Sequence, residues 1–211
     1  RAVKKDPDTA AALPGIHIEG PYISAEDGPR GAHDPDSIRD PSIAEFEKWQ
    51  DAADGRIVLI TLAPELPGAL EFIHEISSRG ILVSIGHTSA KPEIISQAVD
   101  AGARFSTHLG NGSHAKLPRH ENYIWQQLAA DRLDMGIIPD GFHLPPAVMK
   151  SLTRAKGYEK TILTSDVSKM AGMPAGDYVV GNVPVRVYDD GHIGVAGTPF
   201  LAGSGHLLDW S

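Results

Sequence analysis

Six short runs rich in Val, Ile and Leu recur along the chain, and segments with helical periodicity separate them. Most of these runs are continuously apolar, which is typical of strands covered on both faces, as in a parallel sheet. The predicted strands are Gly15–Ile18, Arg56–Leu62, Ile81–Ile85, Arg104–Ser106, Met135–Pro139 and Thr161–Thr164, and the predicted helices are Ile43–Ala52, Ala69–Ser78, Glu93–Ala101, Tyr123–Arg132 and Ala147–Ala155. The alternation predicts an α/β fold with a parallel sheet, either an open doubly wound sheet or a closed (β/α)8 barrel.

The segment after the first strand and the tail of the chain narrow this choice. A doubly wound nucleotide-binding fold normally has a glycine-rich turn after its first strand, and the sequence HIEGPYIS at residues 17–24 is not such a turn. After Met173 the pattern alternates over Tyr178–Tyr188 and His192–Ala196, around Asp189-Asp190-Gly191, which is a hairpin turn sequence. We therefore expect a small antiparallel element to follow the parallel sheet.

Composition excludes several classes of function. The 211 residues suit one compact domain, and 41% of them are hydrophobic, as in ordinary globular proteins. A net charge of −8 gives no overall attraction for nucleic acid or for anionic membranes, so neither is an expected partner. Without cysteine there is no disulfide, thiolate nucleophile or cysteine-bound zinc, so any metal must bind nitrogen and oxygen ligands. No apolar run approaches a membrane span of roughly 18 residues, and we expect a cytoplasmic protein.

Polar residues follow nearly every predicted strand. The strand ends carry Glu19, His87, His108, His143 and Asp166. Each has an ordinary explanation: a strand-end glutamate is usually solvated or paired, a histidine can cap a loop, and Asp166 can cap a helix. In a (β/α) barrel, however, the C-terminal strand ends form one active site, and five such residues at successive strand ends favour this reading. One carboxylate and two histidines from separate strands are typical of an open zinc or iron site.

Five motifs occur in a fixed order along the chain, namely HIEGPYIS, GHTSA, STHLGNG, DGFH and TSD. Over nearly the whole chain they resemble the N-acetylglucosamine-6-phosphate deacetylases of the amidohydrolase superfamily. The resemblance implies a metal-dependent hydrolase with a TIM-type (β/α)8 barrel, which removes the N-acetyl group of N-acetylglucosamine 6-phosphate to give glucosamine 6-phosphate and acetate. It also implies a partial barrel at 1–173, a small antiparallel β element at 174–198, and a loop and the start of the last barrel helix at 199–211.

The same resemblance implies a role for each matching residue. Glu19, His87 and His108 are expected to bind a divalent metal, either zinc or iron, at the one metal site visible in this chain. Asp166 is the expected catalytic acid and base, and His33 the expected group that polarises the substrate carbonyl. The expected substrate-binding residues are Ala32, His33, Asn111, Gly112, Arg119, His143, Leu201, Ala202 and Gly203. Because this arginine reaches the neighbouring subunit's site in the family, a homodimer is also implied.

The chain departs from the family pattern in two respects. Gly110–Ser113 replace the usual aromatic residue and Asn-Ala-Met, and His114 and His120 are added nearby. The family's strand with His-x-His and its neighbouring strand are absent, and because six strands cannot close an eight-stranded barrel, we expect an incomplete barrel. These departures leave two alternatives open: an amidohydrolase that acts on another N-acyl or cyclic amide, and a barrel fragment without catalysis that serves in binding or oligomerisation.

Overall fold

The parallel sheet contains six strands, and their order in space is their order in the sequence. The computed structural model describes residues 6–208, so residues 209–211 of the predicted loop and helix start at 199–211, and residues 1–5 of the predicted partial barrel, lie outside the described residues. The sheet has the order β1-β2-β3-β4-β5-β6. The strands are β1 Ile16–Glu19, β2 Ile57–Leu62, β3 Leu82–Ile85, β4 Phe105–Ser106, β5 Asp134–Ile137 and β6 Thr161–Leu163. A doubly wound sheet would reverse its strand order at one point, and this sheet does not.

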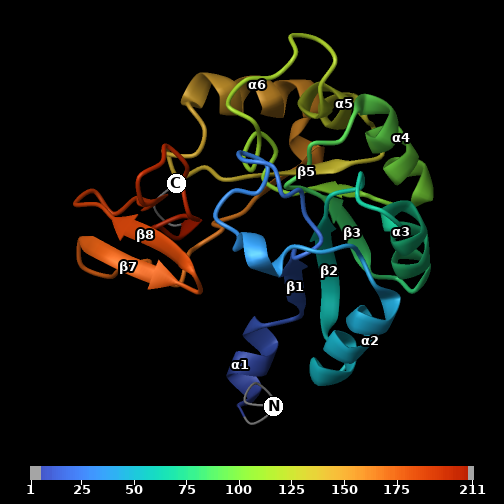
Figure 1. Cartoon of the computed structure of the whole chain (residues 1–211), viewed down its shortest axis with the longest axis horizontal. Coiled ribbons are helices and arrows are strands. Elements are labelled where there is room, and N and C mark those ends of the chain that lie inside the picture. Colours follow the sequence, from blue (N-terminus) through green and yellow to red (C-terminus); the bar gives the residue numbers. More distant parts are fainter. Residues whose placement is uncertain (1–5, 209–211) are drawn as a thin grey trace.

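Helices α2 to α6 connect the strands on the outer face of the sheet, which curls around its inner face (Figure 1). They are α2 Ile43–Ala52, α3 Ala69–Ser78, α4 Pro92–Ala101, α5 Tyr123–Ala129 and α6 Pro146–Lys156, with 3-10 turns at Pro35–Ser37 and Tyr158–Lys160, while a short helix α1, Pro7–Ala12, precedes β1. Parallel neighbours joined by crossovers of one hand place all helices on the same side. The chain therefore forms a curled half-barrel of six parallel strands. Among residues 6–208, no helix has both the length and the apolar character needed to cross a bilayer.

The main core lies between the strands and the outer helices. Ile60 and Val83 on the outer side of β2 and β3 pack in one cluster with Phe72 and Ile73 of α3, and each is at most 2% exposed. The register aligns Glu19 with Thr61 and Thr61 with Ser84, so that these polar side chains share the inner face. From β1 to β3 the sheet thus has the apolar core on its outer face and polar side chains on its inner face.

Helix α5 is shorter than its sequence pattern predicts. It ends at Ala129, whereas the pattern continues to Arg132. The Nζ of Lys156, at the end of α6, donates hydrogen bonds to the carbonyl oxygens of Gln127 and Ala130 at 3.0 and 2.7 Å. The last carbonyl oxygens of a helix have no hydrogen-bond donor within the helix, and the buried ammonium group of Lys156 donates to them instead. A contact from another helix therefore determines where α5 ends.

A second, antiparallel sheet follows the parallel one. It has the order β7-β8-β9, with β7 Gly176–Val180, β8 Val183–Val187 and β9 Ile193–Val195. The alternating stretch at 178–188 is two strands rather than one, because Gly181 adopts a φ of 62° and turns the chain. Asn182 donates a 2.8 Å hydrogen bond to the carboxylate of Asp34, which anchors the turn to the loop after β1. Figure 1 shows this sheet beside the half-barrel.

Candidate metal centre and active site

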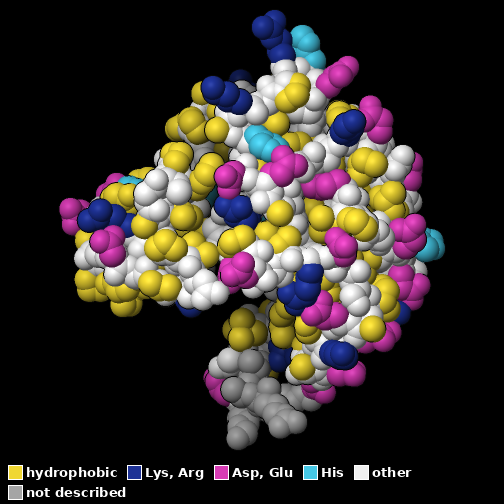
Figure 2. All heavy atoms as spheres, viewed as in Figure 1, with side chains coloured by type: hydrophobic (Ala, Val, Ile, Leu, Met, Phe, Trp, Pro, Cys, Tyr) yellow, Lys and Arg dark blue, Asp and Glu magenta, His cyan; other side chains and the backbone are white. Residues whose placement is uncertain are grey.

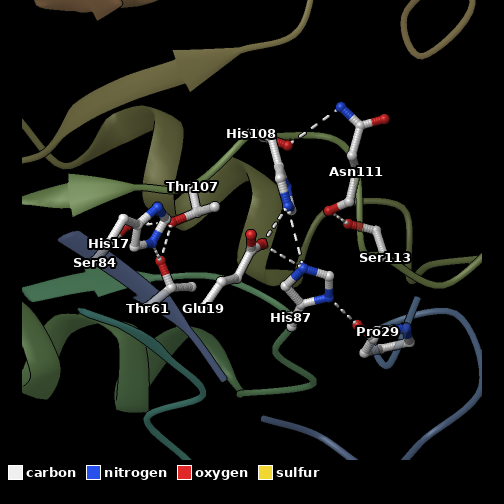
Figure 3. A network of polar contacts seen from close by, with 10 residues as sticks. All are labelled: His17, Glu19, Pro29, Thr61, Ser84, His87, Thr107, His108, Asn111 and Ser113. Carbon is white, nitrogen blue, oxygen red and sulfur yellow. Dashed lines mark hydrogen bonds and ion pairs between the residues drawn. The ribbon is translucent and has the colours of Figure 1, made fainter. Parts of the chain in front are cut away.

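Three side chains from three strand ends converge on one point. Glu19 ends β1, His87 follows β3 and His108 follows β4, and Figure 3 shows all three side chains pointing toward one another. The Oε1 of Glu19 lies 2.8 Å from the Nε2 of His87 and 2.8 Å from the Nε2 of His108, and these two nitrogens are 3.1 Å apart. Within residues 6–208, this is the one group of three or more potential ligands that is compact enough to hold a metal ion.

The donor atoms fit a divalent cation. The Nδ1 of His87 lies 2.8 Å from the carbonyl oxygen of Pro29, and because a carbonyl can only accept, this Nδ1 must donate. In neutral His87 the Nε2 therefore carries a lone pair, which faces the carboxylate oxygen of Glu19. A carboxylate and two imidazoles form a common catalytic ligand set, and a backbone carbonyl that orients one of the histidines is its usual support. The sequence-predicted ligands Glu19, His87 and His108 are thus brought together.

Mutual electrostatic effects keep this group charged. Burial raises the pKa of Glu19, but His108 and then His87 outweigh burial and hold that pKa well below its usual value. Burial lowers the pKa of His108, while the carboxylate of Glu19 overcomes this effect and raises the pKa above its usual value. The centre therefore presents an ionised carboxylate to any bound cation.

The backbone is strained where the site is built. His87, His108 and Asp166 have positive φ angles of 51°, 29° and 46°, and Asp54 is the one other non-glycine residue with this feature in the described part of the chain. Such conformations cost about 1–3 kcal/mol each and cluster at functional sites. The turn at Gly112 also requires glycine, since a Cβ there would lie 2.8 Å from the Nδ1 of His87.

An open cavity of about 620 Å³ contains the converging group. Its lining includes Asp166 and His33 together with Ala32, Asn111, Gly112, His143, Leu201, Ala202 and Gly203, so nearly all the predicted site residues meet there. The backbone carbonyl of Asp166 accepts a 2.8 Å hydrogen bond from the backbone N–H of Ser204, which holds the strand end beside the 201–203 loop.

His33 packs directly on the candidate metal centre. Its ring meets that of His87 edge-on, with centroids 4.6 Å apart. Burial, followed by the neighbouring His87, lowers the pKa of His33 to about 4. The imidazole is therefore neutral at pH 7, and it offers one N–H donor to the cavity.

Arg119 is the predicted substrate residue that does not reach this cavity. It lies on the loop between β4 and α5, with Lys116 and His120, and all three are exposed. This loop projects at the top of Figure 1, where Figure 2 shows basic and histidine side chains. The carbonyl oxygen of Arg119 accepts a 3.1 Å hydrogen bond from the indole of Trp125, which fixes the loop to α5.

A polar network lies beside the candidate metal centre (Figure 3). The Nε2 of His17 lies 2.7 Å from the hydroxyl of Thr61, and that hydroxyl is 2.6 Å from the hydroxyl of Thr107. The hydroxyl of Ser84 lies 2.5 Å from that of Thr107, so the network links strand ends from β1 to β4. These bonds tie together the same strands that carry the three ligands, and they give His17 a structural position on the inner face.

Two loop supports were not predicted from the sequence. Glu65, after β2, accepts hydrogen bonds from the hydroxyl of Thr88 at 2.5 Å and the backbone N–H of Ser89 at 2.7 Å, which fixes the turn that follows His87. His114, which the sequence places near the site, lies outside the cavity lining. Its Nε2 is 3.0 Å from the carboxylate of Glu26 and its Nδ1 is 3.0 Å from the hydroxyl of Tyr123. Glu65 could have been predicted from its position just after a strand. The contacts of His114 depend on tertiary structure and could not.

An aspartate holds His143 in place. One carboxylate oxygen of Asp140 lies 2.7 Å from the Nδ1 of His143, and the other accepts hydrogen bonds from the backbone N–H groups of Phe142 and His143 at 2.9 Å each. Burial raises the pKa of Asp140, but these bonds, led by the one from the His143 ring, outweigh it and place the pKa well below its usual value. The motif DGFH is therefore a turn that orients one imidazole.

We expect Asp140→Asn to lower stability in a pH-dependent way. Since the pKa of Asp140 is depressed in the folded state, its contribution is complete above the unfolded pKa of about 3.9 and is lost as pH falls below it. The variant should be less stable by about 1–3 kcal/mol at pH 7, and the difference should shrink toward pH 3. Urea unfolding of both proteins from pH 3 to 7 measures this. A difference that stays constant with pH would contradict the assignment, and Asp177→Asn, at an exposed pair with Arg186, is the matched control.

Comparisons with known proteins agree with this geometry. No family model matches the chain. N-acetylglucosamine-6-phosphate deacetylase of Bacillus subtilis is 36% identical over 187 residues, which are 89% of this chain and 47% of that protein. N-acetylgalactosamine-6-phosphate deacetylase of Escherichia coli O157:H7 is 33% identical, over 94% of this chain and 52% of that protein. The chain thus spans about half the length of the curated relatives it matches.

Solved structures extend the similarity to the fold. A mutant of N-acetyl-D-glucosamine-6-phosphate deacetylase from Mycobacterium smegmatis, in complex with N-acetyl-D-glucosamine-6-phosphate, matches with a TM-score of 0.89 and 33% identity. The match covers 100% of this chain and 53% of that one. Sequence and fold thus agree over nearly the whole length of this chain, which is similar to about half the length of the N-acetylglucosamine-6-phosphate deacetylases it matches, members of the amidohydrolase superfamily.

Proposed function

We propose that the protein removes the N-acetyl group of N-acetylglucosamine 6-phosphate by metal-dependent amide hydrolysis, giving glucosamine 6-phosphate and acetate. The observation that carries the proposal is the convergence of Glu19, His87 and His108 in a cavity that Asp166 and His33 also line. The similarity to proteins named N-acetylglucosamine-6-phosphate deacetylase supports the same reaction.

The proposed roles follow from the chemistry of the side chains. Glu19, His87 and His108 hold the ion, zinc or else iron, which supplies a Lewis acid and lowers the pKa of water from about 15.7 toward about 7. Asp166 takes the proton of the attacking water and returns it to the leaving nitrogen, which a carboxylate in the cavity can do in both directions. His33, neutral at pH 7, donates its N–H to the acetyl carbonyl as negative charge develops on that oxygen.

The remaining cavity residues have a binding role in this proposal. Asn111, Gly112 and His143 contact the sugar phosphate, while Ala32 and the loop formed by Leu201, Ala202 and Gly203 enclose the sugar. The proposal extends to the whole protein as a cytoplasmic homodimer. In it, the six strands belong to a (β/α)8 barrel, and β7–β9 belong to a small β domain.

The direct test is acetate release from N-acetylglucosamine 6-phosphate by protein reconstituted with zinc or with iron. Unphosphorylated N-acetylglucosamine is the matched control substrate. We expect turnover of the phosphorylated sugar that depends on metal and stops with a chelator. Metal binding without acetate release would contradict the proposed reaction, and the absence of bound metal in a folded protein would favour a barrel fragment without catalysis.

A second candidate is the same hydrolysis on another N-acyl amino sugar or on a cyclic amide. Two observations favour keeping it: the relative from Escherichia coli O157:H7 is named for N-acetylgalactosamine 6-phosphate, and Gly110–Ser113 depart from the usual family sequence beside the cavity. Comparing kcat/KM for the glucose-type and galactose-type substrates separates the two. A higher value for the galactose-type sugar would change the assigned substrate and leave the metal centre unchanged.

We expect Arg119→Ala to raise KM for phosphorylated substrates by about tenfold or more, because a hydrogen bond to a charged group is worth about 1.5–3 kcal/mol. Arg119 is exposed and is not among the residues that line the cavity of its own chain, which supports a contact with the site of a second subunit. Steady-state kinetics with both forms of the sugar, together with sedimentation analysis of the oligomer, measure the effect. An equal change for unphosphorylated sugar would argue against phosphate recognition, and a monomer with wild-type KM would argue against the shared site. Arg154→Ala, on α6, is the control.

A further inference from the structure

Two histidines on the cavity lining are each paired with an aspartate. The Nδ1 of His143, in the loop after β5, lies 2.7 Å from Asp140, and the Nδ1 of His192, just before β9, lies 2.5 Å from Asp190. Both histidines line the cavity that contains the candidate metal centre. Within residues 6–208, neither Nε2 is used by a hydrogen bond, so each ring keeps one nitrogen for a ligand. His143 is a predicted substrate-binding residue, whereas the sequence predicts no role for His192.

A stack of aromatic rings joins His192 to Phe142, the residue before His143. Phe142, the neighbour of His143, stacks on the ring of His192 with centroids 5.3 Å apart and planes at 29°. The ring of His192 also stacks on that of Tyr188 in the same hairpin, with centroids 4.0 Å apart and planes at 10°. The imidazole of His192 is therefore held by two rings and by one carboxylate. This fixes the ring at the border between the small sheet and the half-barrel.

The pairing with aspartate occupies Nδ1 of each ring and leaves Nε2 for a ligand. When such a ring is protonated both of its nitrogens are donors, so Nδ1–H can stay with the aspartate while Nε2–H is available to an anion in the cavity. The hydrogen bond to His192 lowers the pKa of Asp190, so this aspartate is ionised at neutral pH. Two such rings on one cavity lining form a site for an anion, and Arg119 of the same chain does not line this cavity.

We propose that His192, supplied by the small antiparallel sheet, contacts the anionic group of the substrate together with His143. This inference rests on the proposed function, in which that group is the 6-phosphate of the amino sugar. It gives the small sheet a role in substrate recognition, because the hairpin contributes a substrate-binding side chain to the cavity of the half-barrel. His192 is then a specificity residue for phosphorylated sugars, and Asp190 positions it.

The test compares His192→Phe with wild-type protein. Phenylalanine can keep the stack with Phe142 and Tyr188 but has no N–H to donate. We expect KM for N-acetylglucosamine 6-phosphate, and the dissociation constant of inorganic phosphate measured by calorimetry, to rise by about tenfold or more. Metal content and kcat/KM for unphosphorylated N-acetylglucosamine should remain within about twofold of wild type. His74→Phe, at an exposed position of α3, is the matched control and should change none of these values.

Two further measurements keep the outcome decisive. Asp190→Asn alters an exposed residue and should raise the same two constants by a smaller factor, which tests the inference if His192→Phe does not fold. Unchanged KM and phosphate affinity in folded His192→Phe, with wild-type turnover intact, would overturn the role of His192 and leave the proposed reaction standing. If wild-type protein released no acetate, the proposed reaction would fail. The calorimetric phosphate affinity would then still decide whether His192 binds an anion.

Discussion

Replacing Glu19 with Gln is expected to remove the metal from the protein and to abolish turnover with it. The substitution keeps the size of the side chain and removes its charge. The Oε1 of Glu19 lies 2.8 Å from each of the two histidine nitrogens, so this oxygen is the anionic part of the ligand set. Loss of a group that only supports a ligand weakens metal binding by about 10–100-fold, and we expect the loss of a ligand itself to exceed that range.

Elemental mass spectrometry of protein reconstituted with an equimolar amount of zinc measures this prediction. We expect about one metal ion per chain in the wild type and less than about a tenth of that in the variant. Glu75→Gln is the matched control, because Glu75 lies on α3 and is 48% exposed in its ion pair with Arg79. Wild-type metal content in Glu19→Gln would remove Glu19 from the ligand set.

Asp166→Asn is expected to lower kcat by about 10²–10⁴-fold, the usual contribution of general acid–base catalysis, while the metal remains bound. Asparagine fits the same space and can still form hydrogen bonds, but it cannot accept and return a proton. The positive φ of 46° at Asp166 is tolerated by asparagine as well, so the backbone of the strand end should persist.

The measurement is kcat from acetate release, together with metal content and the unfolding temperature of the same preparations. Asp100→Asn on α4 is the control, since Asp100 is 77% exposed and forms a surface ion pair with Arg132. Retained turnover in Asp166→Asn would contradict the role of Asp166 as acid and base. Loss of metal in this variant would place Asp166 among the ligands instead.

The local hydrophobic pattern of the sequence was sufficient to predict the strands of the half-barrel. The apolar runs matched all six parallel strands within a few residues, and two predicted helices, α2 and α3, have the predicted bounds. These elements are well predicted because their buried faces leave a strong periodic pattern. Helix α1 was missed because it has six residues and none of them is buried. The end of α5 was misplaced because Lys156 of another helix determines it.

The candidate site was predictable to the extent that it depends on strand ends. Glu19, His87, His108 and Asp166 lie at or just after the ends of strands, and a parallel sheet brings its strand ends to one edge. His192 leaves no such signal, because its place in the cavity depends on how the hairpin of β8 and β9 packs against Phe142. Glu65 follows a strand as the others do, but its contacts with Thr88 and Ser89 depend on the path of the next loop.

The wide separation of the ligands along the sequence couples metal binding to folding. Glu19 and His108 are 89 residues apart, and they join the two ends of the β1–β4 segment. A metal ion held by these residues would act as a reversible cross-link over this segment, which the unfolded chain cannot form. Free metal at about 1,000 times its dissociation constant would add about 4.1 kcal/mol to the stability of the folded state. The supply of metal would then regulate the lifetime of the folded protein as well as its activity, and a metal-starved cell would lose both together.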